Sequence, residues 1–264
     1  EGRAGIPAWV AEQKAAREKL LKEGGEYYGK MMDRIKHVLA DPGRHHPAYD
    51  PEQGYEIAGF VWFHGFNDLI AGGVYPNGSK PRGYEQYSWL LAQLLKKVKA
   101  ELNAPDMPVV IGVFGQGGKL DKPHPFREAQ AAVADYDEFR GRIAAVRTAQ
   151  FYDDRIEEIK GKYDRVMAYK GGDPDHPYAK LQAKVRAYEE EMKAKASKLQ
   201  GKAQRRLLSS MRRGVSDIVK TPEEIEYLKN NVSNQGYHYN GSPKFFVRAG
   251  VAFANALADL IEGK

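Results

Sequence analysis

The chain has 264 residues, 42% of them hydrophobic and 29% charged, which is enough for one large α/β domain and excludes a disordered composition. It contains no cysteine, which excludes disulfides and thiol catalysis, and no apolar run approaches the ~20 residues that cross a membrane. The net charge of +6 fits an acidic partner or a solvated basic surface, and we favour the surface because no nucleic-acid motif accompanies the charge.

The N-terminal region is predicted to be helical over residues 8–40 and to stop at Asp41-Pro42-Gly43. The following loop contains His45 and His46. We interpret this pair as solvated, because no third metal ligand lies at a recognisable spacing, and we expect no metal or cofactor. Since the first residues contain neither an initiator Met nor an apolar leader, a mature, processed or trimmed product is expected.

Three apolar segments predict strands, and two amphipathic helices lie between them. The strands are expected at 55–63, 109–114 and 143–146, and the helices at 84–102 and 126–139. This alternation predicts an α/β fold with a parallel sheet and right-handed crossovers. The first two strands end in glycine-containing turns, and open sheets of this class bind ligands at the carboxyl ends of their strands.

Residues 153–215 depart from the α/β pattern. They predict an antiparallel hairpin of two helices, at 153–170 and at about 177–213, with a coiled-coil-like seam. The charged outer face is typical of a solvated projection; an arm that binds a partner or nucleic acid, or that mediates oligomerisation, is the alternative.

Two cap-then-proline sequences, Thr221-Pro222 and Ser242-Pro243, predict the last two helices. The predicted organisation is therefore a first α/β part at 1–152, the hairpin insertion at 153–215, and a C-terminal α/β part at 216–264.

Two short segments contain residues suited to acyl-transfer chemistry. In the turn after the first strand, the Gly65 backbone and the Asn67 side-chain amide are donors that can hold an oxyanion, although a plain Asx turn is the alternative. His238 lies in the loop before the last helix, where it can act as a base or fill a structural role.

The same segments resemble a known family. Gly65-Phe66-Asn67-Asp68 resembles the Gly-x-Asn-Asp block of the SGNH/GDSL hydrolases. Residues 59–65 resemble the Trp-[Phe/Tyr]-Gln-Gly block of the sialate O-acetylesterase-like carbohydrate esterase branch, and residues 236–244 are similar to its terminal histidine block. Segments 111–115 and 126–130 also fit, so the resemblance covers roughly residues 25–150 and 220–262.

The resemblance implies a flavodoxin-like, three-layer parallel sheet and a serine esterase that acts on acylated carbohydrate. Gly65 and Asn67 would be oxyanion donors, His238 the general base, and Asp68 the nearest candidate for its acid partner. It also favours an extracellular or periplasmic location. The residues expected to contact substrate are Trp62, His64, Phe66, Gln116 and Tyr237.

The sequence departs from the family pattern at three places. His64 stands where the branch usually has Gln, and Gln235 stands where the acid of an Asp-x-x-His motif is expected. No Gly-[Asp/Gln]-Ser nucleophile block occurs. The serines that could be considered lie in a loop, at a helix start and at a helix cap: Ser79, Ser88 and Ser242.

These departures suggest that the chain is the C-terminal part of a split or processed esterase. An N-terminal polypeptide would supply the serine and the central strand, and the hypothesis requires a neighbour strand on the outer side of residues 55–63. A non-catalytic binding or assembly protein that uses the hairpin is the second interpretation. A nucleic-acid binder that uses the basic hairpin is the third.

Overall fold

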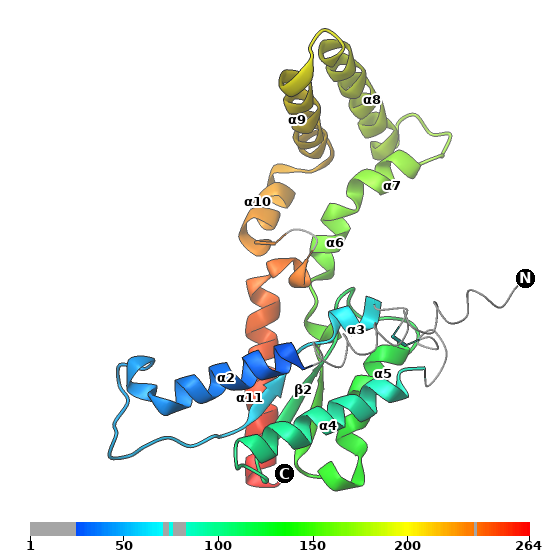
Figure 1. The fold of residues 1–264 in the computed structure, drawn as a ribbon. Helices are drawn as coiled ribbons and strands as arrows, with labels where there is room; N and C mark the ends of the chain where they lie inside the picture. The colour runs from blue at the N-terminus through cyan, green and yellow to red at the C-terminus, as the bar shows by residue number, and fades with distance from the viewer. Residues whose placement is uncertain (1–24, 71–73, 76–82, 235–236) are drawn as a thin grey trace, which may run out of the picture. The chain divides into compact units, whose positions relative to one another are not determined.

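The computed structural model describes residues 25–70, 74–75, 83–234 and 237–264. The strands are β1 (Phe60–Trp62), β2 (Val109–Val113) and β3 (Ile143–Arg147) (Figure 1). The helices are α2 (Glu26–Ala40), α3 (Phe66–Ile70), α4 (Glu85–Glu101), α5 (Pro125–Ala132), α6 (Asp154–Lys160), α7 (Lys162–Ala168), α8 (Pro177–Ala196), α9 (Gly201–Val219), α10 (Pro222–Asn231) and α11 (Pro243–Glu262). None of the helices in these described ranges is both long and apolar enough to cross a membrane.

The chain divides into two compact units. The smaller unit comprises residues 1–57 and 97–104, and the larger comprises 58–96 and 105–264. In the smaller unit, Glu101 accepts hydrogen bonds of 2.9 Å from the Tyr28 hydroxyl and from Lys36 Nζ. The predicted helix ends at Ala40 as expected, and its part before residue 25 lies outside the described residues.

The larger unit is built on an open parallel sheet with the strand order β1-β2-β3, which confirms the predicted α/β class. β2 is the central strand and is completely buried, which explains its uninterrupted apolar sequence. Tyr87, Leu91 and Phe126 from α4 and α5 pack on one face of the sheet. Phe245, Ala249 and Phe253 of α11 pack on the other face.

β1 is shorter than the predicted strand at residues 55–63. Its ladder begins where the Phe60 N–H donates to the Pro108 carbonyl, at 3.0 Å. Pro108 has no N–H to donate in return, so the pairing does not continue toward residue 55. Within the described part of the chain, β1 has no strand on its outer side, and the neighbour strand required by the split-enzyme hypothesis is not provided there.

The predicted two-helix hairpin is built from different helices in the structure. The first predicted helix is divided at Gly161 into α6 and α7, and the second is divided at residues 197–200 into α8 and α9. The main pairing is between α8 and α9, with Val185 packed near Val215 and Val219. Gly201, at φ 60°, begins α9 in a conformation that favours glycine, which allows the chain to reverse there.

The boundaries predicted for this segment also do not coincide with the ends of the helices or with the division into units. Residue 215 lies inside α9, and the whole segment belongs to the same compact unit as the sheet. By contrast, the two predicted caps are confirmed. The Thr221 hydroxyl and the Glu224 side chain form a reciprocal capping box at α10, and Ser242 caps α11.

Gly112 provides a test of packing over the central strand. A Cβ there would meet Phe63 and would lie 2.8 Å from Phe253 Cζ, so we expect Gly112→Ala to destabilise the fold by about 1–3 kcal/mol. Gly250→Ala on α11 is the matched control, because its Cβ meets nothing within 4 Å. Alanine should there stabilise the helix by up to about 1 kcal/mol. Urea unfolding of both variants measures the difference, and equal effects would contradict this packing.

Candidate active site

A cavity of about 310 Å³ lies where the chain leaves β1 and β2, beside the segment that precedes α11. Three of the residues proposed from sequence to carry chemistry, Gly65, Asn67 and His238, all line it. Aromatic rings form most of the remaining wall. The other lining residues are Phe63, His64, Phe66, Phe114, Gln116, Tyr237 and Tyr239.

The turn between β1 and α3 requires glycine at position 65. Gly65 has φ 141°, and a Cβ on it would lie 2.7 Å from the Phe126 ring and 2.9 Å from Gln130 Nε2. Asn67 follows in the first turn of α3. Among the described residues, no acceptor is bonded to the Gly65 N–H or the Asn67 side-chain amide.

Gln130 is a residue whose role the sequence did not reveal, although it lies in the segment 126–130 that resembles the family. Its side chain is fully buried. Oε1 accepts from the Phe114 N–H at 2.7 Å, and Nε2 donates to the His64 carbonyl at 2.9 Å. One amide thereby joins the backbone at the ends of β1 and β2, where the cavity lies.

His238 begins a tight turn in which four consecutive residues have left-handed backbone angles. The φ values are 47° for His238, 56° for Tyr239, 60° for Asn240 and 60° for Gly241. A left-handed conformation costs a non-glycine residue about 1–2 kcal/mol, so tertiary contacts must hold this turn. Consecutive left-handed residues of this kind occur mainly at functional sites.

Several hydrogen bonds hold the turn in place. The Asn240 carbonyl accepts from the N–H groups of Ser233 and Asn234, each at 3.1 Å. The Tyr239 N–H donates to Gln116 Oε1 at 2.9 Å, which ties the turn to the loop after β2. Gln116 also donates from Nε2 to the Tyr152 hydroxyl at 3.4 Å. Gln116 therefore lines the cavity and its amide holds the histidine turn, while its contact with substrate stays a prediction.

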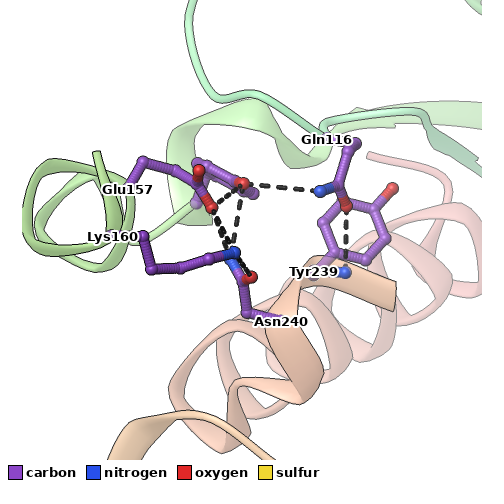
Figure 2. Close-up of polar contacts among 6 residues, drawn as sticks. Gln116, Glu157, Lys160, Tyr239 and Asn240 are labelled. Atoms are coloured by element: carbon purple, nitrogen blue, oxygen red, sulfur yellow. Dashed lines mark hydrogen bonds and ion pairs between the residues drawn. The ribbon is translucent and has the colours of Figure 1, made fainter. Parts of the chain in front are cut away.

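A polar network behind the turn fixes Asn240, as Figure 2 shows. The Asn240 amide donates to Glu157 at 2.7 Å and accepts from Lys160 Nζ at 2.6 Å. The Tyr152 hydroxyl donates to the same Glu157 carboxylate at 2.9 Å. Burial and then the bond to Glu157 raise the pKa of Tyr152 to about 12, so its hydroxyl stays protonated.

The pKa of Glu157 reflects the same network. Partial burial acts to raise it, but the hydrogen bonds from Asn240 and Tyr152 and the charge of Lys160 hold it below its ordinary value. Glu157 is thus a carboxylate at neutral pH, and it accepts both bonds in its charged form.

His238 is paired with an amide in the structure. Its Nδ1 lies 2.8 Å from the side-chain nitrogen position of Asn234, four residues earlier. An amide that turns its oxygen toward this ring accepts from Nδ1–H and leaves Nε2 free to take a proton, as in Cys-His-Asn sites. Gln235, at the family's expected acid position, lies outside the described residues.

Asp68, the sequence candidate for the histidine's acid partner, is engaged elsewhere. It accepts from the Tyr75 hydroxyl at 3.0 Å, and its other oxygen lies 3.9 Å from His64 Nδ1. The Asp68 carboxylate, which was expected to orient His238, therefore lies beside His64, which lines the cavity. The contact is short-range, because His64 lies just before α3 and Asp68 lies in it, four residues later.

Trp62 was expected to contact substrate, but it does not line the cavity. Successive side chains of a strand point to opposite faces, so Phe63 faces α11 and Trp62 packs into the cluster with α4 and α5. The indole stacks on Phe60 with ring centroids 6.3 Å apart. Trp62 is therefore half-buried against the hydrophobic core, and its contact with substrate stays a prediction.

Two of the three serines considered from the sequence occupy structural positions. Buried Ser88 donates to the Ala129 carbonyl at 2.7 Å, Ser242 caps α11, and Ser79 lies outside the described residues. The described lining of the cavity contains no Ser, Thr or Cys. In the part of the chain that the structure describes, His, Asp and Glu form no group of three able to hold a metal.

Comparison with known proteins gives no relative: no family model, curated protein or solved structure matches this chain. The chemistry of the cavity is therefore argued from its own residues and from the motif resemblance.

The buried Gln130 amide yields a stability prediction. Gln130→Leu keeps the volume but leaves the Phe114 N–H and the His64 carbonyl without their partner, which costs about 1–3 kcal/mol for each group. Exposed Gln150, which has a single bond to the Arg147 carbonyl, is the control; Gln150→Leu should change stability by less than about 0.5 kcal/mol. Urea unfolding distinguishes the two, and a neutral Gln130→Leu would refute the cross-link.

Glu157 yields a pH prediction. Because its folded-state pKa lies below its ordinary value of 4.5, its carboxylate stabilises the fold above that pH, and this contribution is lost as the pH falls through the lowered pKa. Glu157→Gln should therefore lower stability at pH 7 and have less effect at pH 3.5. Glu158→Gln is the control on the same helix. Urea midpoints across this range provide the measurement, and parallel curves for wild type and Glu157→Gln would disprove the coupling.

Proposed function

We propose that this chain forms the C-terminal portion of a serine carbohydrate O-acetylesterase of SGNH type. The observation that supports the proposal is that Gly65 and Asn67, from one end of the sheet, and His238, from just before the last helix, line one cavity. These are the donors and the base that ester hydrolysis requires.

In the proposed reaction, a serine hydroxyl attacks the carbonyl carbon of an acetyl ester, and His238 Nε2 takes the hydroxyl proton. The Gly65 N–H and the Asn67 amide stabilise the oxyanion of the tetrahedral intermediate. Collapse of the intermediate breaks the ester bond, and His238 returns the proton to the departing sugar hydroxyl. Water then hydrolyses the acetyl-serine by the same steps, with His238 again acting as base.

The serine comes, in this proposal, from a polypeptide segment outside these 264 residues. In a flavodoxin-like sheet with the strand order 2-1-3-4-5, the strand that precedes the Gly-x-Asn turn has further strands on its outer side. No described residues form a strand on the outer side of β1, so the strand that the proposal requires there would have to come from the same outside segment, and its pairing would remove an exposed sheet edge. The same assembly would lie in an extracellular or periplasmic compartment.

The cavity suits a small acyl group on a sugar. Its volume of about 310 Å³ lies at the lower end of the range for small-molecule sites. Phe66 and Tyr237 are 49% and 66% exposed, so both rings are accessible beside it. Exposed rings offer flat apolar surface to the C–H face of a pyranose, while His64 offers a polar group for its hydroxyls.

A non-catalytic binding or assembly protein is the second candidate. Two observations favour it: His238 is paired with an amide, and the described cavity lining has no nucleophile. In this case the aromatic cavity would bind a ligand without turnover, and the α8–α9 pair would provide partner contacts.

Hydrolysis of p-nitrophenyl acetate tests the proposal. The chain alone should be inactive, and adding a fragment that carries a Gly-[Asp/Gln]-Ser block should restore hydrolysis. In the restored enzyme, Asn67→Ala should lower kcat by about 10²–10³-fold, because one oxyanion donor is lost. His238→Ala should abolish turnover.

His46→Ala and Asn230→Ala are the matched controls, since both residues lie outside the cavity lining. Equal activity from the chain alone, or indifference to His238→Ala, would rule out the split-site mechanism. Native mass spectrometry of the natural protein would show directly whether a second polypeptide co-purifies.

A further inference from the structure

One face of α9 carries five exposed cations. They occupy positions that recur at helical spacing and, at 3.6 residues per turn, cover roughly 120° of the helix circumference. We call this set the cationic face: Lys202, Arg205, Arg206, Arg212 and Arg213. The opposite side of α9 is apolar and contributes Met211 and Ile218 to the cluster shared with α8, while Val215 and Val219 of that cluster lie between the two sides.

The cationic face differs from part of the charged surface of α8, although Lys184 and Arg186 of α8 likewise have no ion pair among the described residues. On α8, Lys180, Lys193 and Lys195 each form an ion pair with a nearby acid, at distances from 2.5 to 3.8 Å. Among the described residues, no acid pairs with any of the five cations on α9. The only acid of α9, Asp217, acts on Lys220.

An uncompensated face of this kind is not explained by stability. Like charges three or four residues apart destabilise a helix by about 0.2–0.5 kcal/mol per pair, and α9 has two such pairs, Lys202–Arg205 and Lys202–Arg206. Four of the five cations are arginines, whose planar guanidinium binds carboxylate, sulfate or phosphate in a bidentate manner. The arrangement therefore fits an anionic ligand better than a merely solvated surface.

The spacing indicates the form of this ligand. The pairs Arg205–Arg206 and Arg212–Arg213 are seven residues apart, which is about 10.5 Å along the helix. This is close to the length of one disaccharide in an extended polysaccharide. Many acidic glycans carry one carboxylate or sulfate on each disaccharide, so successive anions would meet successive arginine pairs.

We infer that the cationic face of α9 binds a linear anionic polysaccharide and holds acylated polymer on the protein. The choice of a glycan rests on the proposed carbohydrate esterase function, whereas the charge and spacing arguments do not. The surface would add affinity for polymeric substrate without contributing to the hydrolysis of small esters.

The test measures binding of a chondroitin sulfate oligosaccharide to the full chain at two salt concentrations. The variant is Arg205→Gln/Arg206→Gln/Arg212→Gln/Arg213→Gln. The control, Lys180→Gln/Lys193→Gln/Lys195→Gln/Lys229→Gln, removes the same charge from lysines that already have acidic partners. Gln has good helix propensity, and circular dichroism checks that both variants are folded.

We expect the arginine variant to weaken binding at least about tenfold and to reduce its salt dependence, while the control changes binding by less than about threefold. Equal losses in both variants would overturn the proposal, because net charge alone would then explain binding. Tighter binding of a DNA duplex through the same arginines would overturn it in favour of a nucleic-acid partner. Because the assay measures binding and not hydrolysis, its result can be interpreted even if the esterase proposal fails.

Discussion

The buried amide of Gln130 is the contact on which the arrangement of the cavity depends. It bonds the His64 carbonyl at the end of β1 and the Phe114 N–H at the end of β2, and so fixes where the two loops leave the sheet. The same side chain occupies the space in which a Cβ of residue 65 would lie. Gly65 and Gln130 therefore depend on each other, because only glycine at position 65 leaves room for the Gln130 side chain. Asn67 follows this turn directly, so the same packing fixes its position.

A second constraint acts on His238. Its turn has four consecutive left-handed residues, a conformation that Asn240 and Gly241 adopt readily but that is costly for Tyr239. Gln116 holds the turn from the loop after β2, and Glu157 and Lys160 hold it from α6. The free energy that these bonds provide offsets the backbone strain, so a histidine in a surface segment has a defined position.

The helices between β3 and α11 therefore do more than project from the sheet. Their first part supplies Glu157 and Lys160 to the histidine turn, and buried Asp153 accepts from Tyr227 of α10 and Lys244 of α11. Their far part, α8 and α9, carries the cationic face. An element that the sequence pattern presents as an insertion thus holds the turn of His238 in the cavity and also offers a separate charged surface.

The sequence by itself determined the α/β class, the fully apolar central strand, the two capped helices and the grouping of Gly65, Asn67 and His238. Each depends on short-range patterns: apolar runs, cap-then-proline pairs and motifs of a few residues. The contacts of Asp68 with His64 and Tyr75 and of Asn234 with His238 span only four to seven residues, and only the structure showed them. Tertiary structure alone decided that Trp62 packs against the hydrophobic core. It also decided the roles of Gln130 and Glu157, because the physical reason for each is a hydrogen bond to residues tens of positions away. No local pattern encodes such a partner.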